Sequence, residues 1–94
     1  MDLQQLLRND LVTVVDVRSP GEYLMGHVAG SINIPLQEIP ARVSDLKAIG
    51  KPLVLCCASG NRSGQAERYL RQQGMHNVHN GGSWMDVEHL TEKA

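Results

Sequence analysis

The amino-acid sequence predicts an α/β protein with a mainly parallel central sheet flanked by helices on both faces. Two stretches, residues 11–17 and 53–57, are almost continuously apolar, as in strands that are buried on both faces. Segments with apolar residues at helical spacing lie between and after these stretches. Buried strands that alternate with amphipathic helices are typical of this fold class.

Length and composition limit the kinds of protein that this chain can be. Its 94 residues suffice for one domain, which we expect to span residues 1–94. Hydrophobic residues make up 41% and charged residues 20% of the chain, which excludes a disordered protein. The formal net charge of -1 lacks the basic excess of a nucleic-acid-binding protein. No apolar run approaches the roughly 18 residues of a membrane span, so we expect neither nucleic acid nor membrane as a partner.

The cysteines bear on the cellular compartment. The two cysteines are adjacent, at Cys56 and Cys57, and neighbouring cysteines rarely form a disulfide with each other. A free thiol pair favours a reducing compartment, and residues 1–10 lack the apolar core of a signal peptide. We therefore expect a cytoplasmic protein. A periplasmic location stays open, because a leader that had been removed would leave no trace here.

The first half of the chain predicts two short helices and two strands. Asp2 can cap a helix near the N-terminus, and the strand over 11–17 follows it. Residues 19–22, Ser-Pro-Gly-Glu, have the capping-box pattern of a helix start, and Gly26 ends this short helix. Residues 31–34 can form a brief strand.

The second half predicts longer elements. Apolar residues recur at helical spacing over 36–46, with Pro40 near the first turn. The buried strand over 53–57 then leads into a small, glycine-containing loop. The remaining predicted elements are a helix over 63–73, a short strand over 76–79, a loop that begins at Gly81-Gly82, and a final helical turn over 84–90.

The turn after the strand 53–57 is where chemistry is expected, because parallel sheets bind ligands at the carboxyl ends of their strands. Its small residues let successive backbone N–H groups point to one centre, and the helix N-terminus and Arg62 add positive charge. These groups favour a thiolate at Cys57 over the thiol and hold an anionic substrate over its sulfur. The sequence therefore predicts a thiolate nucleophile in an oxyanion cradle. The turn reads Cys57-Ala58-Ser59-Gly60-Asn61-Arg62-Ser63.

Some residues near this turn allow a structural role as well as a functional one. Cys56 is one residue below the strand tip, so we expect it to be a buried core residue. Arg62 lies at the positive end of a helix dipole, which calls for a compensating anion. Asp16 ends the first strand at the same sheet edge. It either accepts N–H groups of the loop or is an ordinary turn residue. Trp84 is either a lid on the core or the wall of a pocket.

The four histidines do not predict a metal site. His76 and His79 lie three residues apart beside a strand, and no second ligand cluster accompanies them. His27 follows a glycine at a turn, where we expect its ring to hydrogen-bond to nearby backbone.

Three segments of the chain resemble the rhodanese homology domain. The opening signature of that family resembles Asp16-Val17-Arg18, then Glu22-Tyr23, then residues 26–35, Gly-His-Val-Ala-Gly-Ser-Ile-Asn-Ile-Pro. Residues 57–63 resemble its active-site loop, and Gly81-Gly82 matches the glycine pair after its last strand. The resemblance runs from about residue 12 to 84 and is to the small members that lack an inactive partner domain.

The resemblance implies sulfurtransferase chemistry without a metal or organic cofactor. Cys57 takes the position of the family's nucleophile, which attacks the outer sulfur of thiosulfate or another sulfane donor and becomes a persulfide. Cyanide in assays, or a thiol or a protein acceptor in cells, then takes the terminal sulfur. The backbone N–H groups of Ala58, Ser59, Gly60, Asn61, Arg62 and Ser63 hold the persulfide charge. Arg62 recruits the anionic donor, and Asp16 and Arg18 support the site.

A phosphatase or arsenate reductase is an alternative, because some of these enzymes share the fold and the opening signature. They use a loop one residue longer, and the span from Cys56 to Arg62 fits that length. The apolar run 53–56 resembles strand interior, and the loop residues lie at the sulfurtransferase spacing from Cys57. The smaller ring also suits one sulfur atom better than a tetrahedral phosphate. These observations favour the shorter loop.

A non-catalytic role is the third reading. The domain could be a sulfur carrier or a redox-sensing module that hands persulfide sulfur to a protein. The adjacent Cys56 and Cys57 keep this reading open, because a thiol at Cys56 is able to reduce the persulfide or to be glutathionylated.

Overall fold

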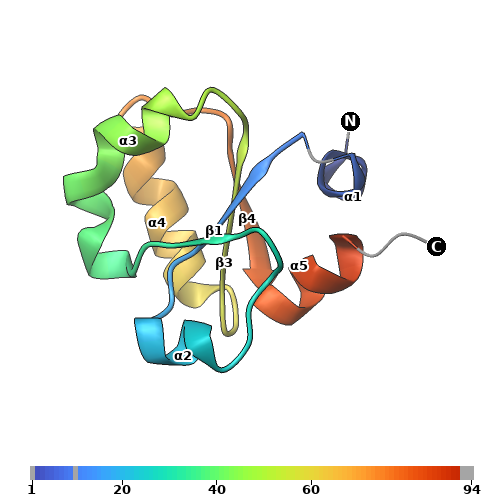
Figure 1. Ribbon diagram of the computed structural model, residues 1–94. Helices are drawn as coiled ribbons and strands as arrows, with labels where there is room; N and C mark the ends of the chain where they lie inside the picture. The colour runs from blue at the N-terminus through green and yellow to red at the C-terminus, as the bar shows by residue number, and fades with distance from the viewer. Residues whose placement is uncertain (1, 10, 92–94) are drawn as a thin grey trace.

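The computed structural model describes residues 2–9 and 11–91, and their strands form a four-stranded sheet (Figure 1). Its order is β2-β1-β3-β4, and each neighbouring pair is parallel. The predicted parallel α/β fold is therefore confirmed. The strands are β1 (Thr13–Asp16), β2 (Ile32–Asn33), β3 (Leu53–Cys57) and β4 (Val78–Ser83).

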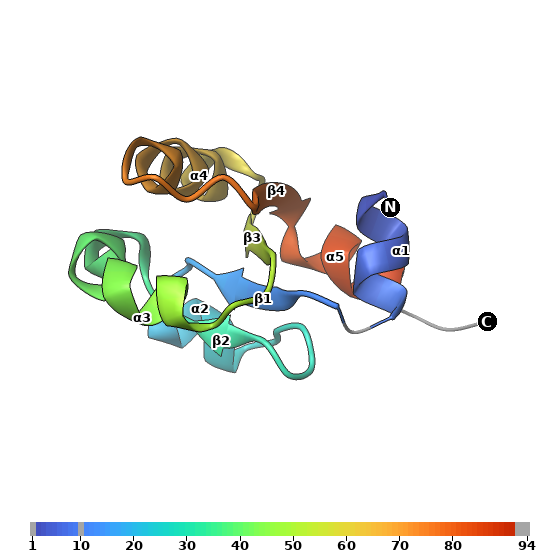
Figure 2. The ribbon, with the colours of Figure 1, turned by 90° about the horizontal axis from the view of Figure 1, so that it is seen from above.

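Helices cover both faces of this sheet, as predicted (Figure 2). One face carries α4 (Asn61–Gln72) together with the 3-10 helix η1 (Leu36–Arg42) and α3 (Val43–Ala48). The other face carries α1 (Leu3–Arg8) and α5 (Trp84–Thr91), which pack on each other. The short α2 (Pro20–Leu24) lies at the carboxyl end of the sheet, beside the turn between β3 and α4 (Figure 1). No described helix is long and apolar enough to cross a membrane.

Each face of the sheet has an apolar core of its own. Successive residues of a strand point to opposite faces, so alternate residues of β3 enter different cores. Leu53, Leu55 and Cys57 pack in the cluster under α4, whereas Val54 and Cys56 pack in the cluster under α1 and α5. All five side chains are at most 1% exposed. The adjacent cysteines therefore lie on opposite sides of the sheet.

Several element boundaries differ from the prediction. β1 and β2 are shorter than residues 11–17 and 31–34, because each has sheet partners over only part of the apolar run. The predicted helix over 36–46 divides into η1 and α3. Pro40 lies inside η1, and a proline has no N–H to donate within a regular α-helix. α4 begins at Asn61 instead of residue 63, so Arg62 belongs to its first turn.

The prediction of a loop from Gly81-Gly82 was wrong, because β4 continues through both glycines to Ser83. The register is shifted there: Leu55 pairs with Asn80, but Cys56 pairs with Gly82. Gly81 is therefore an extra residue, as in a β-bulge. A Cβ at Gly81 would lie 2.6 Å from Val87 Cγ2 and 2.8 Å from Val54 Cγ1, so only glycine fits there without a shift.

Candidate functional site

The turn between β3 and α4 folds around the sulfur of Cys57. The backbone N–H of Gly60 donates to Cys57 Sγ at 3.0 Å, and that of Ser63 does so at 3.5 Å. Ser63 Oγ lies 3.4 Å from the same sulfur. Ala58, Ser59 and Asn61 are exposed and form the outer rim of the turn. The loop thus has the nest geometry that residues 57–63 predicted, with Cys57 at its centre.

Gly60 makes this tight turn possible. Its φ of +95° is in the left-handed region, which side-chain-bearing residues avoid. A Cβ on Gly60 would also lie 3.2 Å from Gly82 Cα. The loop is therefore packed directly against the bulge of β4, and both conditions require glycine.

Asn80 on β4 holds the loop from the side. Its Nδ2 donates to the carbonyl of Gly60 at 3.1 Å, and its Oδ1 accepts from Ser63 Oγ at 2.7 Å. The same Oδ1 accepts the N–H of Gly82 at 2.9 Å. The sequence reasoning missed this residue, because its contacts join positions 17 and 20 residues apart.

Ser63 links Asn80 to Cys57 through a single hydroxyl proton. When that proton points to Asn80 Oδ1, the thiol of Cys57 can donate its own proton to Ser63 Oγ. When Cys57 is a thiolate, the Ser63 hydroxyl can turn and donate to the sulfur. Asn80 Oδ1 then still accepts the hydrogen bond from the N–H of Gly82. The chain of three side chains can therefore follow the protonation state of Cys57.

The two cysteines have opposite pKa shifts. Burial would raise the pKa of Cys57, but hydrogen bonds from the Ser63 hydroxyl and from the N–H groups of Ser63, Ser59 and Gly60 stabilise the thiolate, and the pKa is lowered. Burial and the charge of Asp16 raise the pKa of Cys56 to about 12, although Arg18 opposes this. Cys57 is thus the one poised to be a thiolate.

Cys56 lies outside the loop, in agreement with its predicted role as a buried core residue. It is fully buried, not disulfide-bonded, and packed on the face of α1 and α5. The loop N–H groups point to Cys57 Sγ instead. The structure therefore gives no support to the longer loop from Cys56. It also gives no support to Cys56 as a reductant for a group on Cys57, because the two side chains point to opposite faces of the sheet.

Asp16 does not accept N–H groups of the loop, so that alternative was wrong. Its carboxylate is held by Arg18, whose Nη2 lies 2.7 Å and whose Nε lies 2.9 Å from the Asp16 oxygens. Both side chains are buried. Arg18 also donates to the carbonyls of Gly26 and Glu22, and its Cζ lies 4.8 Å from the centre of the Trp84 ring. This pair ties β1 to the segment around α2.

Trp84 serves mainly as packing for the segment around α2. A Cβ on Gly26 would lie 3.0 Å from the Trp84 ring, so the backbone of residue 26 passes close against the indole. Trp84 also packs against the core under α1 and α5. His27 Nδ1 lies 2.8 Å from the carbonyl of Tyr23, which confirms the predicted bond to nearby backbone.

Arg62 has a partner that the sequence analysis did not identify. Its Nη1 and Nη2 lie 2.7 Å and 2.9 Å from the two carboxylate oxygens of Glu22 on α2. The hydrogen bonds from Arg62, followed by those from Ser19, lower the pKa of Glu22 to about 2. Glu22 also closes the capping box of α2 with Ser19, so one carboxylate serves both the helix start and the loop. The helical pattern alone indicated only the capping role.

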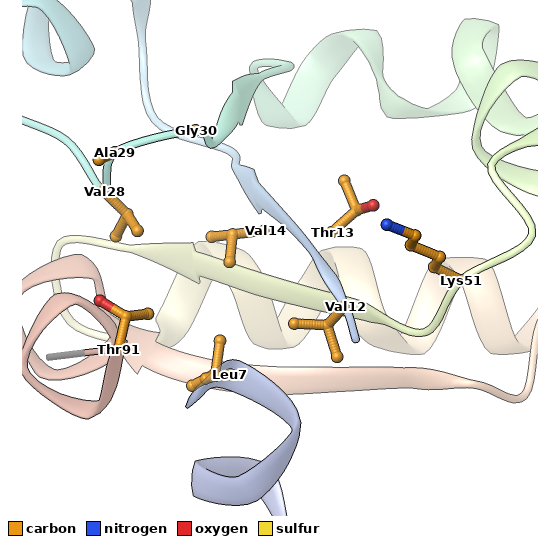
Figure 3. Close-up of a pocket in the computed structure, with 9 residues that line it drawn as sticks. All are labelled: Leu7, Val12, Thr13, Val14, Val28, Ala29, Gly30, Lys51 and Thr91. Atoms are coloured by element: carbon orange, nitrogen blue, oxygen red, sulfur yellow. The ribbon is translucent and has the colours of Figure 1, made fainter. Parts of the chain in front are cut away.

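The described part of the loop has no cluster of metal ligands, and a cavity lies elsewhere on the sheet. Among the described residues, no group of three His, Cys, Asp or Glu side chains is placed to hold a metal ion. A cavity of about 280 Å³ lies beside β1 and is lined by Val12, Thr13, Val14, residues 28–30 and Lys51, with Leu7 and Thr91 (Figure 3). No residue of the turn 57–63 lines it, so the loop site is a separate place at the sheet edge.

The site therefore consists of a cysteine held by backbone N–H groups at the end of a parallel strand, with an arginine in the first turn of the next helix. The chain belongs to the rhodanese family: the family model described as "Rhodanese-like domain" matches residues 1–86. This confirms the resemblance in the opening signature and the loop.

The chain is similar to proteins of several bacteria. It is 38% identical over 74 residues to the thiosulfate sulfurtransferase PspE of Escherichia coli, covering 78% of this chain and 71% of PspE. It is 40% identical over 77 residues to the protein slr1261 of Synechocystis, covering 81% of this chain and 42% of slr1261, less than half its length. The solved structure titled "rhodanese with anions from E. coli" superposes with a TM-score of 0.73 at 36% identity, covering 80% of this chain and 89% of that one.

Proposed function

We propose that this protein is a sulfurtransferase that carries a sulfane sulfur on Cys57. The observation that carries the proposal is the environment of Cys57 Sγ, which accepts hydrogen bonds from the backbone N–H groups of Gly60 and Ser63. These groups stabilise a negative charge on the first sulfur and, after transfer, on the persulfide. Relatives named thiosulfate sulfurtransferase support the same class of reaction.

The reaction has two half-steps and a covalent intermediate. First, the Cys57 thiolate attacks the outer sulfur of thiosulfate or another sulfane donor. A new sulfur–sulfur bond forms, the bond inside the donor breaks, and sulfite or a thiolate leaves with the electron pair. Cyanide, a thiolate or an acceptor protein then attacks the terminal sulfur, and Cys57 leaves as the thiolate. Charge and atoms balance in both steps, and neither requires a metal or an organic cofactor.

The loop residues take distinct parts in this scheme. The N–H groups of Gly60 and Ser63 hold the charge on sulfur, and the exposed Ala58, Ser59 and Asn61 border the side from which a donor approaches. Arg62 borders the same opening, where it can contact an anionic donor. Asp16 and Arg18 act indirectly: Arg18, held by Asp16, donates to the carbonyls of Glu22 and Gly26 and so fixes the segment that carries Glu22.

Intact-mass measurement after brief incubation with thiosulfate tests the proposal. The reduced wild-type protein is expected to gain the mass of one sulfur atom, and cyanide is expected to remove it. Cys57→Ser is expected to gain nothing. If folded, reduced wild-type protein gains no sulfur from thiosulfate or from an organic persulfide, the proposal fails, and phosphate and arsenate esters become the next substrates to assay.

A further inference from the structure

The charges around the loop are paired before any donor arrives. Arg62 faces the Glu22 carboxylate with both terminal nitrogens, and Arg18 holds the Asp16 carboxylate with Nε and Nη2. These four charged side chains sum to zero. The attraction that the loop offers to an anion therefore comes chiefly from its backbone N–H groups.

The Glu22 carboxylate is fixed in place rather than loosely associated with Arg62. Its Oε1 accepts from the backbone N–H of Ser19 at 3.2 Å and from Ser19 Oγ at 3.0 Å, as part of the α2 capping box. Each oxygen of Glu22 also accepts from one Arg62 nitrogen. With its pKa at about 2, Glu22 is charged throughout the neutral range. A donor that binds over Cys57 therefore meets a fixed negative charge next to the arginine.

A donor with two negative charges and a donor with one experience this arrangement differently. The loop N–H groups can stabilise one negative charge, because those of Gly60 and Ser63 point at Cys57 Sγ. A second charge on the donor meets an arginine that is already neutralised and a carboxylate that repels it. To take over the Nη1 and Nη2 hydrogen bonds that Glu22 accepts, a doubly charged donor has to displace this carboxylate.

We propose that Glu22 sets donor specificity by favouring singly charged sulfane donors, such as thiosulfonates and organic persulfides, over doubly charged thiosulfate. This rests on the proposed sulfurtransferase function and deepens it. Glu22 acts through the charge of Arg62 and is a specificity-determining residue, with no part in bond making or breaking.

Thiosulfate and methanethiosulfonate form a matched pair of probes. Each presents a terminal sulfur on an oxidised sulfur atom, but thiosulfate carries two negative charges and methanethiosulfonate one. In both reactions the Cys57 thiolate takes the terminal sulfur, and the leaving group, sulfite or methanesulfinate, departs with the electron pair. The ratio of their kcat/KM values therefore reports on the charge of the donor.

Glu22→Gln tests the proposal, because glutamine keeps the size and can still cap α2. We expect it to raise the thiosulfate to methanethiosulfonate ratio of kcat/KM by roughly three- to tenfold, the effect of one nearby partly exposed charge. Arg62→Ala should shift the ratio the other way. Glu67→Gln, which breaks a Glu–Arg pair further along α4, should leave the ratio unchanged. Thermal unfolding of each variant verifies that it is folded.

Two readouts separate this inference from the proposed function. If both donors turn over and Glu22→Gln does not change the ratio, the specificity proposal is wrong while the function stands. If neither donor turns over, calorimetric binding of thiosulfate to Cys57→Ser, with and without Glu22→Gln, decides. Tighter binding with Glu22→Gln supports the role of Glu22 and leaves the sulfurtransferase function refuted, and equal binding refutes both.

Discussion

Cys56 and Cys57 are neighbours in the sequence and have opposite surroundings. Cys56 points into the core under α1 and α5, where burial raises its pKa to about 12. Cys57 is equally buried, but it faces the turn that opens α4, and hydrogen bonds from that turn lower its pKa. Burial alone therefore does not decide whether a cysteine is reactive. What differs is whether polar hydrogens are directed at the sulfur.

The alternation of side chains along a strand produces this difference. A shift of one residue exchanges the two faces of the sheet, and the Leu53–Cys57 strand ends so that its last residue enters the loop. The same shift distinguishes the sulfurtransferase loop from the longer phosphatase-type loop. The two readings of the loop therefore differ in which of the two cysteine side chains faces the turn.

The largest expected effect comes from removing the thiol of Cys57, with removal of the Cys56 thiol as the comparison. Cys57→Ser should abolish sulfur transfer from thiosulfate to cyanide, because the nucleophile is lost. Cys56→Ala should keep most of the activity and lose some stability, because it leaves a small cavity in the opposite core. Steady-state formation of thiocyanate measures both variants.

Circular dichroism serves as the control, since each variant has to retain the wild-type fold for the comparison to count. Loss of activity in Cys56→Ala with activity retained in Cys57→Ser would reverse the assignment of the loop and favour the longer ring from Cys56.

A smaller loss of activity is expected when the pKa of Cys57 is moved toward the raised pKa of Cys56. Ser63→Ala removes the hydroxyl that contributes most to lowering the pKa of Cys57, so this pKa should rise. The thiolate forms as the pH rises through the pKa, so the variant should have less thiolate than wild type at neutral pH. Since a hydrogen bond to a charged group contributes about 1.5–3 kcal/mol, activity at pH values below the wild-type pKa of Cys57 should fall about tenfold or more.

The ultraviolet absorbance of the thiolate, followed against pH, measures this shift without requiring a reagent to reach the buried sulfur. Cys57→Ser supplies the baseline. A titration midpoint that does not move in Ser63→Ala would show that the backbone N–H groups alone set the pKa of Cys57.

The smallest expected effect is on stability rather than chemistry. Gly81→Ala places a methyl group against Val54 and Val87, on the Cys56 side of the sheet. Overpacking of this kind costs about 1–3 kcal/mol of unfolding free energy. Gly21→Ala is the matched control, because a Cβ there meets nothing within 4 Å. Urea denaturation compares the two, and equal midpoints would mean that the bulge relaxes at no cost.

The sequence was sufficient for the fold class and for the geometry of the loop because both rest on local patterns. Continuous apolar runs marked β1 and β3, and the small residues of 57–63 indicated a nest of N–H groups. The capping pattern at Ser19 placed the start of α2 correctly. Each of these signals lies within a few residues of the feature that it specifies.

The contacts that complete the site are non-local, and the sequence reasoning missed them. The Glu22–Arg62 pair joins positions 40 residues apart, so no helical or strand period reveals it. Asn80 reaches the loop from β4, across 20 residues of sequence and next to the register shift at Gly81. Asp16 had two readings, and only the packing of Arg18 beside it decided between them.

The dependence of the loop on Asn80 has a consequence for protein synthesis. A ribosome makes Cys57 and the whole turn before it makes Asn80, which lies 20 residues beyond Gly60. Until β4 has emerged and paired with β3, the turn lacks the amide that holds Gly60 and Ser63. A nascent chain therefore presents the Cys57 thiol in a turn that Asn80 does not yet hold. The complete site forms only after the last strand has joined the sheet.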